Sequence, residues 1–166
     1  VTLDKELGEV DLLITQAKAE STRHEARRSA ATDKLAAMPP NGDANDRVEQ
    51  TANLVTLTGD SHNAWAFDLA DERGSLGVEF AGQSVSSYGF ERRFTGDPKR
   101  IAADFIAANS DLKWMDTSQR GYFTLDITRE RIEAEYLFVP ALGGRSATVT
   151  GCKTIAVEHG ARRLSV

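Results

Sequence analysis

The chain has 166 residues, of which 40% are hydrophobic and 27% charged, so it is long enough to form a domain with a hydrophobic core. Its formal net charge of −5 lacks the cationic excess of a broad nucleic-acid binder, and no apolar run reaches the ~18 residues of a membrane span. The single cysteine, Cys152, excludes an internal disulfide and a thiolate metal cluster, so a metal site would use carboxylate and imidazole ligands.

Residues 1–50 are predicted to form a helix followed by a linker. Apolar residues recur at helical spacing and predict a helix over residues 3–37; they are Leu3, Leu7, Val10, Ile14 and Ala17. The prolines and turn-forming residues of 38–46 then end the helical pattern. We therefore expect a helical lead with its linker over residues 1–50, and a separate strand-rich part over residues 51–166.

The strand-rich part begins with short apolar runs. These runs predict strands over residues 53–58, 65–69 and 76–82. A turn at residues 71–74 separates the second strand from the third, and residues 83–89 form a polar loop after it.

A helix and a hairpin are predicted next. Asp97 and Pro98 provide a capping acceptor and a first-turn proline, and the apolar face of the helix would contain Ile101, Phe105, Ile106 and Leu112. Alternating apolar and polar residues over 123–138, interrupted at 128–131, predict a β-hairpin. A last strand is predicted over residues 153–158.

The strongest candidate for a metal site directly follows the first strand. Gly59 ends the apolar run, and Asp60 and His62 come after it at positions i and i+2. On an extended backbone these two side chains project to the same side, so an oxygen and a nitrogen ligand can converge on one cation or on two neighbouring ones. The spacing leaves a second interpretation open, in which Asp60 accepts backbone N–H groups in a turn and His62 packs on the surface.

The same segment offers a nucleophile. Residues 59–61 resemble the opening block of the GDSL-type esterases, which would make Ser61 the nucleophile of a serine esterase. The late histidine of that family follows an aspartate by three positions, whereas the residue three positions before His159 is Ala156. Other polar residues are expected to be solvent-facing, structural or loop hydrogen-bonding groups: His24, Ser84, Ser86, Ser87, Arg92, Arg93 and Cys152.

Several separate segments together resemble the PhoD-like alkaline phosphatases and phosphodiesterases of the metallophosphoesterase group. The order and spacing of these segments also agree, and the resemblance covers about residues 53–140. It rests on residues 54–69, 77–87, 109–116, 120–128 and 131–136.

The resemblance carries expectations for the site and the fold. It implies that Asp60 and His62 are the last metal ligands of a centre that holds clustered ions, Fe3+ with Ca2+, and that the reaction is hydrolysis of phosphate mono- or diesters. It also implies an α/β fold of α+β-like character, in which helices flank a sandwich of two β-sheets, and a secreted or periplasmic location.

The family's other metal ligands have no counterpart in this sequence. They are an aspartate with a cysteine, an aspartate with a tyrosine, and an asparagine, all upstream of the segment that resembles residues 54–69. We therefore expect this sequence to be the C-terminal portion of such an enzyme, to need the N-terminal remainder as its partner, and to be inactive alone. The alternative is a noncatalytic piece that docks onto a larger assembly.

Overall fold

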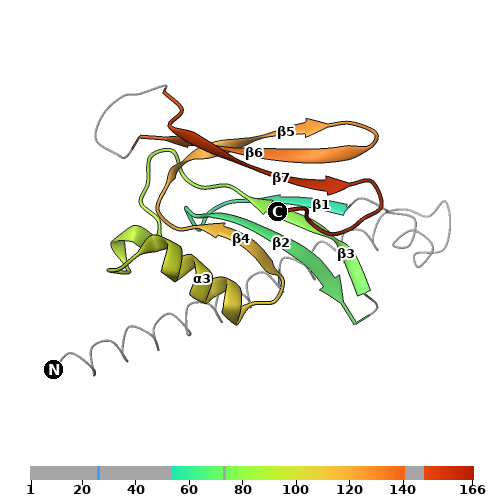
Figure 1. The fold of residues 1–166 in the computed structure, drawn as a ribbon, viewed down its shortest axis with the longest axis horizontal. Coiled ribbons are helices and arrows are strands. Elements are labelled where there is room, and N and C mark those ends of the chain that lie inside the picture. The colour runs from blue at the N-terminus through green and yellow to red at the C-terminus, as the bar shows by residue number, and fades with distance from the viewer. Residues whose placement is uncertain (1–25, 27–53, 73, 141–147) are drawn as a thin grey trace.

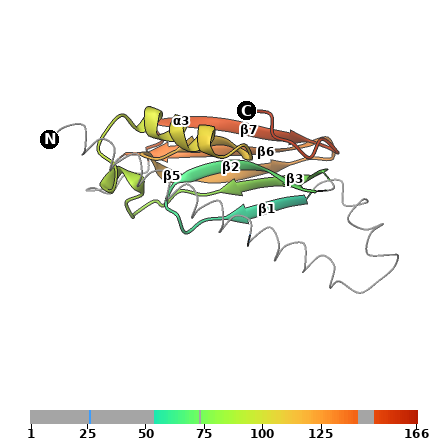
Figure 2. The ribbon, with the colours of Figure 1, turned by 90° about the horizontal axis from the view of Figure 1, so that it is seen from below.

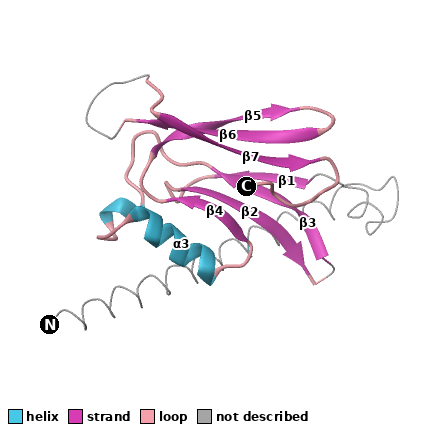
Figure 3. Cartoon of the chain, viewed as in Figure 1, coloured by secondary structure: helices cyan, strands magenta, loops and turns pink. Residues whose placement is uncertain are grey.

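The computed structural model describes residues 26, 54–72, 74–140 and 148–166. The predicted helix over residues 3–37 and the linker after it therefore lie outside the described residues, apart from Ala26, which is helical and exposed. From residue 54 on, the described chain is mostly β-strand, with one α-helix (Figure 3). No helix among the described residues is long and apolar enough to cross a membrane.

The first sheet has four strands in the order β1-β3-β2-β4. They are β1 (Leu54–Thr58), β2 (Ala64–Asp71), β3 (Gly74–Ala81) and β4 (Leu112–Asp116). β1 pairs in parallel with β3, whereas β2 is antiparallel to both β3 and β4. The three strands predicted from apolar runs are thereby confirmed, with boundaries within a few residues.

The second sheet contains the predicted hairpin and the predicted last strand. β5 (Arg120–Ile127), β6 (Arg131–Val139) and β7 (Gly151–Glu158) pair antiparallel in chain order. In the hairpin Phe123 pairs with Tyr136 and Ile127 with Ile132, so the alternating residues share one face as the sequence pattern requires. The hairpin prediction is confirmed.

The two sheets and the helix form three layers. α3 (Pro98–Ala108) runs along β2 and β4 on one face of the first sheet, and the second sheet lies against the other face (Figures 1 and 2). Successive side chains of β2 point to opposite faces of the first sheet. Trp65 and Phe67 therefore belong to the core on the helix side, and Ala64 and Ala66 belong to the core between the sheets. A hydrogen bond of 2.8 Å from the Tyr136 hydroxyl to the Trp65 carbonyl joins the sheets across the second core.

Two expectations about the fold need correction. The helix ends at Ala108, where the Asn109 N–H bonds to Ile106 O, so Leu112 does not extend the helical face. Leu112 instead begins β4, a strand that the sequence pattern did not predict, and it is 2% exposed. The expected pair of sheets is present, but one α-helix covers the sandwich within the described residues, so the arrangement is mostly β rather than α/β with several flanking helices.

Candidate metal site

The turn between β1 and β2 has an unusual backbone. Ser61 N–H bonds to Gly59 O at 3.0 Å, and Asp60 and His62 have φ angles of 75° and 60°. Left-handed backbone is uncommon outside glycine, although Asp and His adopt it more readily than most residues, and such strain concentrates at functional sites. The predicted extended geometry of this segment is therefore wrong, but chain length still keeps the Cα atoms of Asp60 and His62 within about 7 Å.

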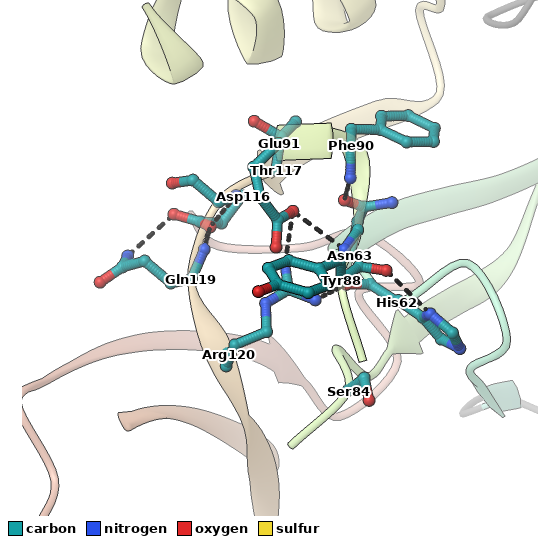
Figure 4. A network of polar contacts seen from close by, with 12 residues as sticks. His62, Asn63, Ser84, Tyr88, Phe90, Glu91, Asp116, Thr117, Gln119 and Arg120 are labelled. Carbon is teal, nitrogen blue, oxygen red and sulfur yellow. Dashed lines mark hydrogen bonds and ion pairs between the residues drawn. The ribbon is translucent and has the colours of Figure 1, made fainter. Parts of the chain in front are cut away.

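The imidazole of His62 has a defined orientation. Its Nδ1 lies 3.0 Å from Tyr88 O (Figure 4). Because a backbone carbonyl only accepts hydrogen bonds, Nδ1 must carry the proton, and in the neutral ring Nε2 then keeps its lone pair. Metal-binding histidines are held in this way, with the other ring nitrogen donating to a carbonyl or carboxylate. His62 thus fits a ligand that binds through Nε2.

Asp60, two positions before His62, supplies an available carboxylate. The residue is exposed, and none of the described residues forms a hydrogen bond or ion pair with its side chain. The interpretation in which Asp60 accepts backbone N–H groups of the described turn therefore finds no support. In the same described ranges no group of three or more His, Cys, Asp or Glu side chains lies close enough to hold a metal, so Asp60 and His62 remain a pair of donors.

A buried polar network lies behind the His62 turn. Asn63 is fully buried, and its amide accepts from Phe90 N at 3.0 Å and donates to Ser61 O at 2.7 Å. Arg120, only 2% exposed, donates from Nη1 to His62 O at 2.6 Å and to Ser87 O at 2.8 Å (Figure 4). These bonds fix the turn against the loop that contains Tyr88.

In the described part of the chain, the guanidinium of Arg120 has one ion-pair partner. Its Nη2 lies 3.2 Å from Glu91 Oε2, an oxygen that also accepts Gly89 N at 2.9 Å. Burial lowers the pKa of Arg120, and the charges of Glu91 and Asp116 oppose that shift. Asp116 also caps the turn before β5, since its Oδ1 accepts Ser118 N at 2.9 Å and Gln119 N at 2.7 Å. This turn places Arg120 at the start of β5.

The side chain of Ser61 has a structural role. Its Oγ accepts Trp65 Nε1 at 2.6 Å and Asn63 N at 3.3 Å, and no described histidine or carboxylate hydrogen-bonds to it. His159 lies at the opposite end of the sandwich, where its N–H bonds to Glu130 O, and β5 alone spans about 23 Å between the two ends. The arrangement a serine nucleophile requires is therefore not found among the described residues.

The remaining candidates fall into three groups. Ser84 behaves as a loop hydrogen-bonding group, because its Oγ accepts Ser86 N at 3.2 Å and Ser87 N at 2.9 Å. The guanidinium of Arg92 lies 3.8 Å from the centre of the Tyr88 ring, and Arg93 and Cys152 are exposed. His24 lies outside the described residues.

Comparison with known proteins identifies the family. The family model described as PhoD-like phosphatase matches residues 13–136. The chain belongs to the PhoD-like phosphatase family. It is 30% identical over 103 residues to Alkaline phosphatase D of Bacillus subtilis (strain 168), a match that covers 59% of this chain and 17% of that protein.

A solved structure supports the same fold. The structure titled "Structure of PhoD" matches 72% of this chain and 23% of its own chain, with a TM-score of 0.51 and 18% sequence identity. The chain thus spans less than a quarter of the length of each of these two relatives.

The PhoD-like pattern alone did not identify the network behind His62. Asn63 and Arg120 lie in segments that resemble the family, but the sequence assigned no role to either. Arg120 precedes the alternating apolar residues of β5 and looks like an ordinary polar residue at a strand start. Its burial depends on partners 58, 33 and 29 positions away, which no local pattern reveals.

Proposed function

We propose that Asp60 and His62 are metal ligands of a PhoD-like phosphatase that hydrolyses phosphate mono- or diesters. The observation that carries this proposal is the hydrogen bond from His62 Nδ1 to Tyr88 O, which leaves Nε2 as the available nitrogen. The carboxylate of Asp60, two positions away and without a partner among the described residues, supports the same interpretation because carboxylate and imidazole form a usable donor pair. Membership of the family supports the reaction class.

Each residue has a defined part in this proposal. His62 contributes Nε2, which is the nitrogen with the lone pair in the neutral ring because the proton of that ring lies on Nδ1. Asp60 contributes negative charge from an exposed position. Asp60 and His62 would help to hold metal ions, Fe3+ and Ca2+ by the family resemblance, and these ions would supply positive charge and Lewis acidity for phosphate ester hydrolysis.

The pair of ligands would need further donors. We propose from the resemblance that residues 51–166 are the C-terminal portion of the phosphatase domain, with residues 1–50 as a lead, and that other parts of the enzyme complete the centre. The match covers 17% of the curated relative, which leaves room for such parts. A secreted or periplasmic location belongs to the same proposal, and cell fractionation with an antibody to this chain would test it.

The edge of the first sheet supports a contact with another segment. Among the described residues β1 pairs with β3 on one side, and Leu57 on β1 is 53% exposed. An open strand edge of this kind accepts a further strand. The same edge favours the second candidate function, a noncatalytic piece that docks onto a larger assembly.

Substitution in the phosphatase that contains this chain tests the proposal. We expect Asp60→Asn and His62→Ala each to reduce metal-dependent hydrolysis of p-nitrophenyl phosphate and bis-p-nitrophenyl phosphate by more than the roughly 10- to 100-fold caused by losing a residue that supports a ligand. His159→Ala and Asp126→Asn are matched controls, because both residues are exposed and lie away from the His62 turn.

The outcomes separate the candidate functions. A docking piece would retain the same turnover in all four variants, and wild-type turnover in His62→Ala would show that the proposed ligand is wrong. Chelator-sensitive hydrolysis by residues 1–166 alone would contradict the proposal that the remaining donors lie elsewhere.

A further inference from the structure

Arg120 connects three segments that are far apart in the sequence. Its Nη1 donates both to His62 O at 2.6 Å and to Ser87 O at 2.8 Å, and its Nη2 pairs with Glu91 at 3.2 Å. These partners belong to the turn after β1, to the polar loop, and to the short helix η1 (Phe90–Arg92). One guanidinium therefore fixes the position of the loop relative to the turn.

Two of these bonds control the geometry around the His62 ring. The ring donates from Nδ1 to Tyr88 O, and Arg120 holds both the carbonyl of His62 itself and the carbonyl of Ser87, the residue before the acceptor. The donor and the acceptor of the Nδ1 bond are thus anchored to the same planar group. If that group were removed, the carbonyl groups of His62 and Ser87 would lose their common anchor, and the bond from Phe90 N to Asn63 Oδ1 would remain to join the turn to the loop.

The surrounding contacts leave little room for another arrangement. A Cβ atom at Gly89 would lie 2.5 Å from Asn63 Oδ1, 2.7 Å from His62 O and 2.9 Å from Arg120 Nη2. The backbone of the same loop is also held by side chains, since Asn63 Oδ1 accepts Phe90 N at 3.0 Å and Glu91 Oε2 accepts Gly89 N at 2.9 Å. The loop therefore reaches the turn only in close contact.

Burying an arginine in this way is costly. Arg120 is 2% exposed, its one carboxylate partner is Glu91, and its Nε has no hydrogen-bond partner among the described residues. A buried ion pair rarely adds net stability relative to apolar packing, and an unsatisfied buried N–H costs further free energy. A gain in overall stability therefore does not explain why an arginine is buried here. The placement of the carbonyl groups of His62 and Ser87 explains it better.

We propose that Arg120 is a positioning residue that fixes the tautomer and orientation of His62, so that Nε2 stays available as a ligand. The inference deepens the proposed function and rests on it, because availability of Nε2 matters only if His62 binds a metal. Arg120 acts through the carbonyl groups of His62 and Ser87 and touches neither metal nor substrate. A planar guanidinium is suited to this task, because its fork meets two oxygens and a carboxylate at once, which the compact ammonium of lysine does not match.

NMR on the 166-residue chain tests the proposal without depending on activity. The ¹⁵N shifts of the His62 ring are recorded well above the ordinary titration range of histidine, in the wild type and in Arg120→Lys. We expect the Nδ1–H tautomer to dominate in the wild type and the Nε2–H tautomer to become substantial in Arg120→Lys. Arg131→Lys is the matched control, since that arginine starts the next strand with its side chain 51% exposed.

Binding of Mn2+ alone provides a second readout. We expect the Mn2+ concentration that broadens the amide signals of the His62 turn to rise about 10- to 100-fold in Arg120→Lys, and to stay unchanged in Arg131→Lys. Broadening that persists in His62→Ala would refute the proposed ligand. An unchanged His62 tautomer in Arg120→Lys would refute only the positioning role.

A second variant covers the case in which Arg120→Lys does not fold. Glu91→Gln keeps the guanidinium and the shape of its partner but removes the charge that orients Nη2. We expect the same change of tautomer in Glu91→Gln, in smaller proportion. A wild-type tautomer ratio in folded Glu91→Gln would then overturn the inference.

Discussion

Two arginines begin the two strands of the same hairpin, and their surroundings are opposite. Arg120 at the start of β5 is 2% exposed and bonds to residues 58, 33 and 29 positions away. The side chain of Arg131 at the start of β6 is 51% exposed and pairs at 2.7 Å with Glu133, two positions along the same strand. The hairpin therefore joins an end where the arginine side chain makes long-range polar contacts to an end where it makes a local one.

The backbone also differs between the Arg120 end and the Arg131 end of the hairpin. At the Arg131 end, Thr128 Oγ1 closes the turn by accepting Glu130 N at 3.2 Å and Arg131 N at 3.1 Å, all within three residues. At the Arg120 end, Asp60 and His62 adopt left-handed backbone and Asn63 is fully buried. Strain and buried polar groups persist where the rest of the structure compensates for them, and they concentrate at functional sites. Both features lie at the His62 end of the hairpin, which is therefore the end that carries the candidate site.

Alanine substitution of the two arginines tests this comparison most directly. We expect Arg120→Ala to lower the free energy of unfolding by about 3–5 kcal/mol, because it leaves Glu91 and two carbonyl groups without their partner. Arg131→Ala should cost about 1 kcal/mol or less, since its ion pair is exposed. Urea unfolding followed by circular dichroism measures both, and similar losses in the two variants would remove the distinction between the ends.

Glycine substitution sharpens the comparison within the His62 end. Gly89→Ala places a Cβ 2.5 Å from Asn63 Oδ1 and 2.7 Å from His62 O, and we expect a loss of about 1–3 kcal/mol as the loop is forced away. Gly59→Ala is the matched control, because a Cβ there meets nothing within 4 Å, and it should change stability by less than about 1 kcal/mol. Equal effects in urea unfolding would contradict a specific contact at Gly89.

Much of the fold was accessible from the sequence because it depends on local periodicity. The alternation over residues 123–138 predicted the hairpin, and Asp97 with Pro98 predicted the start of α3, where Asp97 Oδ1 accepts Lys99 N at 3.0 Å. β4 was missed because its apolar residues, Leu112 and Met115, continue the spacing of the preceding helix. The helix ends at Asn109, which allows the next residues to form a strand, but one asparagine is a weak signal for the end of a helix.

The candidate site was accessible only in part. The resemblance singled out Asp60 and His62, and both lie in one turn, but the spacing argument assumed an extended backbone that the positive φ angles contradict. Their proposed role as ligands stays a prediction. The partners of His62 could not be predicted, because Tyr88 and Arg120 reach it through contacts between segments that are 26 and 58 residues apart in the chain.

The hydroxyl of Tyr136 tests whether burial alone determines how much stability is lost when a polar group is removed. The Tyr136 hydroxyl is fully buried and donates to Trp65 O at 2.8 Å. Tyr136→Phe keeps the ring and removes one neutral hydrogen bond, so we expect a loss of only about 1–2 kcal/mol near neutral pH. Urea unfolding measures it, and a loss as large as that of Arg120→Ala would show that burial, rather than the buried charge and its several partners, determines the cost.

The pH dependence of the free energy of unfolding, compared between the wild type and Tyr136→Phe, isolates the contribution of the Tyr136 hydroxyl. Burial raises the pKa of Tyr136 well above its ordinary value, so the folded protein keeps this proton in alkaline solution. The unfolded chain releases it near pH 10, and stability that depends on the neutral form is therefore lost as the pH rises above about 10. Tyr136→Phe lacks this contribution, so the advantage of the wild type should shrink by about 1.4 kcal/mol between pH 9 and pH 11. A difference that stays constant over this range would mean that the hydroxyl ionises as readily in the folded protein as in the unfolded chain.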